Sequence, residues 1–121
     1  MRRNRRQYLR LRDSARVLVH ARLSHFNAFY EAPLGKVFIK NHKTRWGSCS
    51  QKGNLNFNYK IVLLPPELAD YLVVHELCHL IEFNHSPQFW ALVSQTIPDC
   101  NSLRKQLRQL ERGNRHARIA L

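Results

Sequence analysis

Residues 65–85 read PPELADYLVVHELCHLIEFNH, and the fold is best read outward from this stretch. Its two prolines suit the first turn of a helix, where a missing N–H costs nothing, and Glu67 and Asp70 favour the positive end of the helix dipole. We therefore expect a helix over residues 66–83 that is apolar on nearly all sides. Such a helix belongs in the interior of a domain, so each polar residue within it needs a chemical reason.

The polar residues of this helix include the pattern His-Glu-x-x-His. Because four residues advance an α-helix by slightly more than one turn, His75 and His79 project from the same face and their rings can meet at one metal ion. Neutral imidazole suits Zn²⁺, and Glu76 can act as general base on the water at the metal without being a ligand itself. The pattern predicts one Zn²⁺ per chain and Glu76 as the catalytic residue.

A catalytic zinc usually has three protein ligands and leaves a fourth position to water. His85 lies six residues beyond His79, just after the expected helix end, where the chain can turn back beneath the metal. Glu82 is the alternative, because it continues the helix face of His75 and His79. We expect His75, His79 and His85 as the metal ligands, with Glu82 either replacing His85 or accepting a hydrogen bond behind the ligands.

The segments before the central helix predict one helix and three strands. An amphipathic helix is expected over residues 8–29, with its apolar face along Tyr8, Leu11, Ala15, Leu18 and Arg22. A strand is expected within residues 36–42, and a hairpin over residues 45–59 whose second strand begins at residue 55. The fold class is therefore α+β.

The segments after the central helix predict two further helices. Ser86 is expected as the N-cap of the first, with Pro87 in its opening position, and Ile97 with Pro98 closes it. A last helix begins at Asp99 or Asn101 and ends near Gly113. Its inward residues are expected to be Leu103, Leu107 and Leu110.

The composition fits a soluble globular chain. Its 121 residues are 44% hydrophobic, which suits one domain over residues 1–121, with a basic helix at 1–30, a metal-site core at 36–100 and a basic helix and tail at 101–121. No stretch approaches the roughly 18 apolar residues of a membrane span, and no signal-peptide apolar region follows the arginine-rich start. The three cysteines include no CxxC pair, so we expect reduced thiols and a cytoplasmic location.

The net charge of +12 is unevenly distributed. Residues 1–60 carry 14 Lys and Arg against two acids, residues 61–103 carry five acids and no Lys or Arg, and residues 104–121 carry six basic residues against one acid. Two basic arms thus flank an acidic centre. The arms predict an anionic partner, a nucleic acid or a nucleotide, unless they are simply solvated helix faces.

Several motifs occur in a characteristic order along residues 36–100. They are RWGSCS at 45–50, GNLNFN at 53–58, LPP at 64–66, DYLVVHELCHL at 70–80, NHSPQFW at 84–90 and PD at 98–99. In this order they resemble the YgjP-like metallopeptidase family, which is related to the SprT-like and WLM zinc proteases. The resemblance implies a small zincin domain with a short antiparallel sheet over the metal helix, His75, His79 and His85 as ligands, and Glu76 as the catalytic carboxylate.

Two features depart from the family's pattern. Cys78 stands where the family commonly has a small residue such as alanine, and the N-terminal region is shorter than usual. We expect Cys78 to be a buried packing residue, because a fourth-ligand role would require it to leave its helix face.

These observations predict a zinc-dependent hydrolase, a metallopeptidase whose peptide or protein substrate lies along residues 55–58 by strand addition. Arg45 and, after it, His42 are the candidates for stabilising the developing oxyanion. Two alternatives stay open: a metal-dependent nucleotide phosphohydrolase, and a DNA-associated SprT-like protease or binding module. A steep salt dependence of DNA binding would favour the second, and phosphate release from nucleoside triphosphates the first.

Overall fold

The computed structural model describes residues 4–113. Its elements are, in chain order, α1 (Arg5–Tyr30), β1 (Val37–Lys40), β2 (Gly47–Cys49), β3 (Leu55–Asn58), the 3₁₀ helix η1 (Tyr59–Leu63), α2 (Pro66–Cys78), α3 (Pro87–Thr96) and α4 (Cys100–Gly113). The expected α+β class is confirmed. The outermost parts of the two basic arms, including Arg2 and Arg3, lie outside the described residues.

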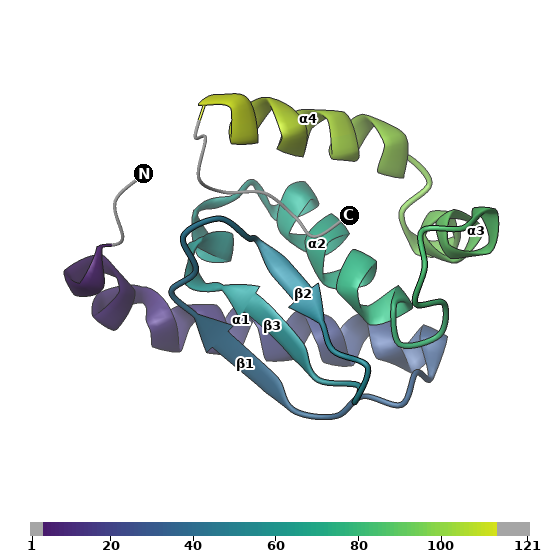
Figure 1. Ribbon diagram of the computed structural model, residues 1–121, viewed down its shortest axis with the longest axis horizontal. Helices are drawn as coiled ribbons and strands as arrows, with labels where there is room; N and C mark the ends of the chain where they lie inside the picture. Colours follow the sequence, from purple (N-terminus) through teal and green to yellow (C-terminus); the bar gives the residue numbers. More distant parts are fainter. Residues whose placement is uncertain (1–3, 114–121) are drawn as a thin grey trace.

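Helix α2 is the centre of the fold. It packs against α1, β2, α3 and α4. Figure 1 shows α2 between the sheet and α4, and α1 running behind the strands. Ten of its 13 residues are buried. The expectation of an apolar central helix is therefore confirmed, and the polar residues within it lie in the interior.

The three strands form a mixed sheet in the order β1-β3-β2. Strands β2 and β3 pair antiparallel as the expected hairpin, with Gly47 opposite Phe57, whereas β1 pairs parallel to β3, with Val37 opposite Leu55. The sheet is thus not purely antiparallel, because β3 inserts between the two strands that precede it. Residues 55–58 are paired on both sides, so the expectation that they form the substrate's edge strand was wrong.

Helix α1 begins earlier than the periodicity indicated, because Asn4 caps it. The Asn4 side-chain oxygen accepts a hydrogen bond from the backbone N–H of Gln7 at 2.9 Å. The helix ends at Tyr30, and Glu31 follows in the left-handed conformation with its N–H donating to the Asn27 carbonyl at 2.9 Å. A short polar side chain before the first helical residue was the signal for the earlier start.

The buried face of α1 is rotated from the expected one. Its buried residues are Ala15, Val19, Leu23 and Phe26. Arg22 instead lies at the edge of this face, where its guanidinium donates to both carboxylate oxygens of Asp70 on α2, at 2.7 and 3.0 Å. The hydrogen bond to Asp70 raises the pKa of Arg22. The packing against α2 and η1, which no local pattern encodes, sets the rotation.

Helix α2 ends at Cys78, five residues before the expected end. The backbone N–H groups of Leu80 and Ile81 donate to carbonyls three residues earlier, at 3.1 and 3.0 Å, so the last turn tightens and the helix stops. Ile81 and Phe83 are 42% and 48% exposed, although their spacing continued the apolar pattern. The early end frees residues 79–85 to form a loop that turns back toward the helix.

Helices α3 and α4 largely follow the expectation. The Ser86 hydroxyl accepts from the Phe89 N–H at 3.3 Å and so caps α3. On α4, Leu103 and Leu107 are buried, but Leu110 is 43% exposed, so its inward placement was wrong. None of the helices within residues 4–113 combines the length and the apolar character that crossing a membrane requires.

Candidate metal centre

Three histidines from two parts of the chain converge beside the end of α2. His75 lies within the helix, His79 is its C-cap residue, and His85 comes from the loop that follows. Their ligand nitrogens all lie within 4.8 Å of one another. His75 and His79 are buried, and His85 is the most exposed of the three. The structure thus brings together the three residues expected as ligands.

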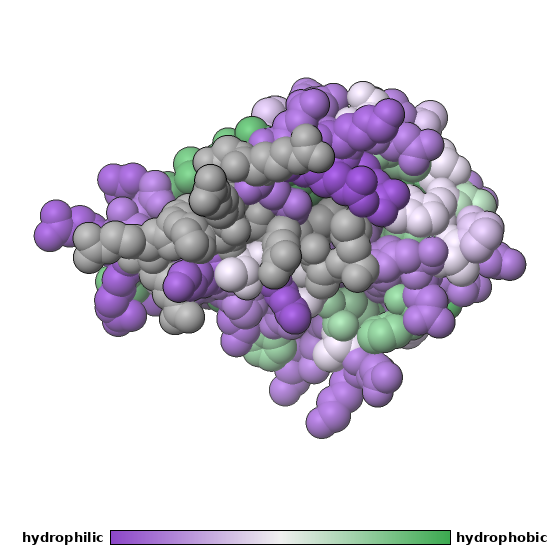
Figure 2. Space-filling model, turned by 45° about the horizontal axis from the view of Figure 1, so that its top comes forward, coloured by the Kyte–Doolittle hydropathy of each residue, from purple (hydrophilic) through white to green (hydrophobic). Residues whose placement is uncertain are grey.

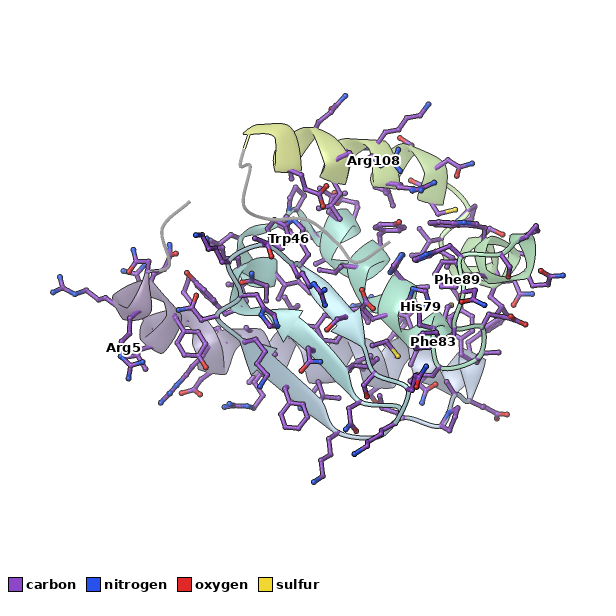
Figure 3. The ribbon with its side chains drawn as sticks, in the orientation of Figure 1. Arg5, Trp46, His79, Phe83, Phe89 and Arg108 are labelled. Atoms are coloured by element: carbon purple, nitrogen blue, oxygen red, sulfur yellow. The ribbon has the colours of Figure 1, made fainter. Side chains whose placement is uncertain are left out.

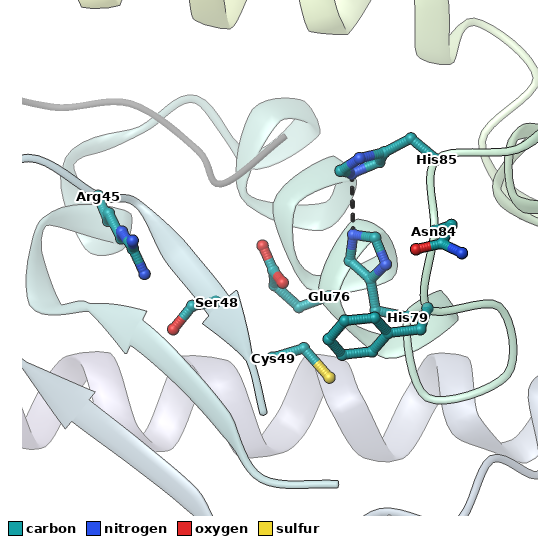
Figure 4. A pocket seen from close by; sticks show the side chains of 8 residues that line it. Arg45, Ser48, Cys49, Glu76, His79, Asn84 and His85 are labelled. Atoms are coloured by element: carbon teal, nitrogen blue, oxygen red, sulfur yellow. Dashed lines mark hydrogen bonds between the residues drawn. The ribbon is translucent and has the colours of Figure 1, made fainter. Parts of the chain in front are cut away.

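Hydrogen bonds orient two of these rings. The Nδ1–H of His79 donates to the backbone carbonyl of Glu82 at 3.3 Å, which leaves Nε2 with a lone pair. The Nε2 atoms of His79 and His85 lie 2.9 Å apart (Figure 4), close enough to bind one metal ion together. Within residues 4–113, the group that can hold a metal consists of the three histidines, and Glu82 contributes its backbone carbonyl behind His79.

An aromatic wall from α3 and a cation from α4 hold the rings in place. Phe89 stacks on His79 with ring centroids 4.4 Å apart, and Trp90 stacks on His85 at 5.9 Å. The guanidinium of Arg104 lies 4.6 Å from the centroid of the Trp90 ring. The contacts of Phe89 and Trp90 with the histidines follow from Ser86 starting α3 directly after His85.

The imidazoles are suited to be neutral ligands. Burial, and then the charge of His75, lower the pKa of His79. Burial and the neighbouring histidines lower the pKa of His85 to about 4, with a further contribution from Arg104. At neutral pH the uncharged rings of His79 and His85 therefore keep a nitrogen lone pair available for a metal ion.

Glu76 is a buried carboxylate beside these rings. Its Oε2 accepts from the Nδ1–H of His75 at 3.3 Å. Its Oε1 is buried and has no hydrogen-bond partner within residues 4–113. Glu76 and the histidines His79 and His85 face β2 across a pocket of about 280 Å³ (Figure 4), which is also lined by Arg45, Ser48, Cys49, Phe83 and Asn84.

Gly47 allows β2 to lie against the carboxylate. A Cβ at this position would lie 3.1 Å from both Cγ and Oε2 of Glu76 and 3.2 Å from the carbonyl oxygen of Asn56. Gly47 was not among the residues expected at the site. Its signal was available, because a glycine inside a strand often marks a close approach of other groups.

The two candidates for oxyanion stabilisation are placed differently. Arg45 lines the pocket and its side chain lies beside Ser48 on the β2 side (Figure 4). The backbone carbonyl of His42 accepts from the Asn58 side-chain amide at 2.9 Å, and His42 is not part of the pocket lining. Of the two, Arg45 is the one that lines this pocket.

The cysteines lie apart from the histidine nitrogens. Cys78 is buried on the side of α2 that faces Tyr30, and burial raises the pKa of its thiol to about 12. This agrees with a packing role. Cys49 lines the pocket at the end of β2, and burial followed by the charge of Glu76 raises the pKa of its thiol to about 11. Both thiols are therefore protonated at neutral pH.

Comparison with protein families decides the relationship. The model of the YgjP-like metallopeptidase domain matches residues 2–110. The chain belongs to the YgjP-like metallopeptidase family. Comparison with curated proteins gives no match.

Among solved structures, this family member is similar to the crystal structure of the metallopeptidase zymogen of Pyrococcus abyssi abylysin. The TM-score is 0.69 at 23% identity, over 84% of this chain and 99% of that chain. At this identity the likeness shows a shared fold.

The residues present fit the metal that a metallopeptidase family implies. Three imidazole nitrogens are a donor set that Zn²⁺ prefers. The Nε2 of His75 is buried and has no hydrogen-bond partner within the described part of the chain. An unpaired buried polar atom costs free energy unless another group satisfies it, and a metal ion at this position would do so.

Proposed function

We propose that this protein is a zinc metallopeptidase, in which His75, His79 and His85 hold one Zn²⁺ and Glu76 is the general base. The observation that carries the proposal is the convergence of three imidazoles beside a pocket into which two of them, His79 and His85, face together with the buried carboxylate of Glu76, whose Oε1 has no partner within residues 4–113. Family membership supports peptide hydrolysis over the nucleotide phosphohydrolase alternative.

The proposed division of labour follows from the contacts. A Zn²⁺ ion held by His75, His79 and His85 would supply Lewis-acid chemistry, which activates water and polarises the carbonyl of the scissile bond. Glu76 is held by its hydrogen bond from His75 through Oε2, so Oε1 is left to accept the proton of the attacking water and pass it to the leaving amine. Arg45 supplies the positive charge that favours the oxyanion as it develops.

The substrate strand is reassigned from residues 55–58 to β2. No strand within residues 4–113 pairs with the outer edge of β2, and Ser48 and Cys49 of this strand line the pocket. An extended peptide added to this edge would hydrogen-bond to the backbone of β2 and pass over Glu76. Main-chain hydrogen bonds then position the scissile bond independently of the peptide's sequence.

An anionic partner is proposed for a surface away from the pocket. Five exposed arginines lie in the first part of α1, which contains one acidic residue, Asp13: Arg5, Arg6, Arg10, Arg12 and Arg16. Arg5 lies at one end of the molecule and His79 on the other side of its middle (Figure 3), and hydrophilic residues make up most of the coloured surface in Figure 2. A polyanion held there would leave the metal pocket open to a peptide.

The decisive test is Glu76→Gln, which keeps the size and hydrogen-bonding reach of the side chain and removes the base. We expect zinc content and melting temperature to stay nearly unchanged, while zinc-dependent peptide turnover falls by at least roughly a hundredfold. Full peptidase activity in this variant contradicts the role of Glu76. Release of phosphate from nucleoside triphosphates by the zinc-loaded protein, without cleavage of any peptide, would replace the proposed reaction by phosphohydrolysis.

A further inference from the structure

A second pocket adjoins the metal pocket on the other side of His79. Its volume is about 480 Å³. One wall is formed by Pro33, Leu80, Ile81 and Phe83, and the other by the turn between β2 and β3, residues 50–53. His79 and Phe83 line both pockets, and Figure 3 shows them close together near the end of α2. The two pockets therefore adjoin each other at His79 and Phe83.

The walls of this apolar pocket are fixed by the fold. The Gly35 N–H donates to the Gly53 carbonyl at 3.0 Å, and the Ser50 N–H donates to the Asn54 carbonyl at 2.9 Å. Gly53 has a φ of 84°, which favours glycine, and the position of a Cβ there lies 3.9 Å from the Leu80 side chain. The turn is thus tied to the segment after α1 and lies against Leu80, so the pocket is formed before any ligand arrives.

The wall of Pro33, Leu80, Ile81 and Phe83, opposite the polar turn at residues 50–53, favours an apolar ligand group. Ile81 and Phe83 keep 42% and 48% of their surface exposed, although they follow directly on the buried helix α2. Exposed large apolar side chains beside a polar site mark a contact surface for a ligand. Lys52 is a cation at the rim, and the lining contains no aspartate or glutamate. The pocket therefore disfavours lysine and arginine side chains.

We propose that this apolar pocket is a specificity subsite that accepts a large apolar side chain, such as leucine or phenylalanine, from the peptide whose scissile bond lies in the metal pocket. The inference rests on the proposed peptidase function. Strand β2 runs from the metal pocket to the turn at residues 50–53, so a peptide along its edge reaches both pockets. Because alternate side chains of an added strand point to opposite sides, a single peptide position meets the apolar pocket.

The first experiment varies the substrate. The zinc-loaded protein is given peptides with Ala, Leu, Phe, Lys or Asp at each of several positions on both sides of the cleaved bond. At one position we expect kcat/KM to be at least about tenfold higher for Leu and Phe than for Ala, and lowest for Lys. Equal kcat/KM values at every position overturn the subsite.

The second experiment inverts the preference. In Ile81→Glu, a carboxylate enters the apolar wall, so we expect peptides with Lys at the selected position to overtake those with Phe, with zinc content unchanged. Leu110→Glu is the matched control, because Leu110 is 43% exposed, undergoes the same charge change and lies in neither pocket. An unchanged preference in Ile81→Glu, or the same change in both variants, overturns the proposal.

A binding measurement separates the subsite from the proposed function. N-acetyl-phenylalaninamide is titrated into the zinc-loaded protein, and the NMR signals of the Ile81 methyl groups and the Gly53 amide are followed. Shifts at both, absent with N-acetyl-alaninamide, support the subsite even if no peptide is cleaved, a result that would overturn the peptidase function alone. Peptide cleavage without discrimination and without these shifts overturns the subsite and leaves the peptidase function standing.

Discussion

Helices α1 and α2 lie against each other but differ in almost every physical respect. Ten of the 13 residues of α2 are buried, whereas only four of the 26 residues of α1 are buried. In α2 a polar side chain needs a partner inside the protein, because burying it without one costs free energy. The histidines and Glu76 therefore indicate a functional site. In the first part of α1 the arginines are exposed, so they indicate what binds at the surface of the molecule. A polar residue in α2 therefore indicates a functional site, whereas a charged residue in the first part of α1 indicates a property of the surface.

The largest expected effect comes from removing the histidine ligands on and after α2. In His75→Ala and in His79→Ala we expect complete loss of bound zinc, because each removes a ligand that the helix holds in place. In His85→Ala zinc binding should be strongly weakened. Metal content of the purified proteins is the measurement.

Glu82→Ala is the control for this series, since its backbone carbonyl, which accepts from His79, is kept. It should retain stoichiometric zinc. Loss of zinc from Glu82→Ala together with full retention in His85→Ala would reassign the third ligand to the Glu82 carboxylate.

A smaller effect is expected from a substitution that crowds the Glu76 side chain but leaves Glu76 itself in place. In Gly47→Ala the new methyl group would lie 3.1 Å from the carboxylate, so either β2 or Glu76 must shift. We expect kcat/KM for peptides to fall by about ten- to a hundredfold, because small misplacements of a catalytic group are costly. Zinc content should be unchanged, and wild-type activity would show that β2 yields without disturbing Glu76.

The smallest effect is expected on α1, where the charges are exposed. Replacing Arg5, Arg6, Arg10 and Arg12 with Gln should leave zinc content and peptide turnover unchanged. The binding constant K for DNA falls as the salt concentration rises. If duplex DNA is the anionic partner, each lost phosphate contact makes the slope of log K against log salt shallower by about 0.9. The measurement is DNA binding at several salt concentrations.

The matched control removes the same total charge from another part of the molecule, by changing Lys36, Lys40, Lys43 and Lys52 to Gln. A shallower slope in the α1 variant alone locates the anionic partner on this helix. Equal slopes in both variants and the wild type would show that these arginines are solvated surface residues that do not bind DNA.

Much of the site could be predicted from the sequence because its residues are close in the chain. His75 and His79 share a helix face through the geometry of one turn, and His85 is six residues away, so local spacing was sufficient to bring all three together. The helix start was equally local, since Pro66 and its neighbours mark it directly. The Ser86 cap of α3 was predictable for the same reason.

The features that were missed depend on contacts between distant segments. The parallel pairing of β1 with β3, and with it the edge position of β2, arises from the path between strands and not from their composition. The rotation of α1 was set by its partners, through which Arg22 reaches Asp70, 48 residues away. The end of α2 at Cys78 was hidden because Leu80 and Ile81 continue an apolar pattern after the helix has stopped.

The early end of α2 has an electrostatic consequence. The peptide dipoles of a helix add up to a partial negative charge at its C-terminal end, carried by carbonyls without intrahelical partners. His75 and His79 lie in the last turn and at the cap of α2, so a divalent cation held by them would sit at this negative end. The carbonyls of the last turn then attract the cation, in a low-dielectric interior that screens their field weakly.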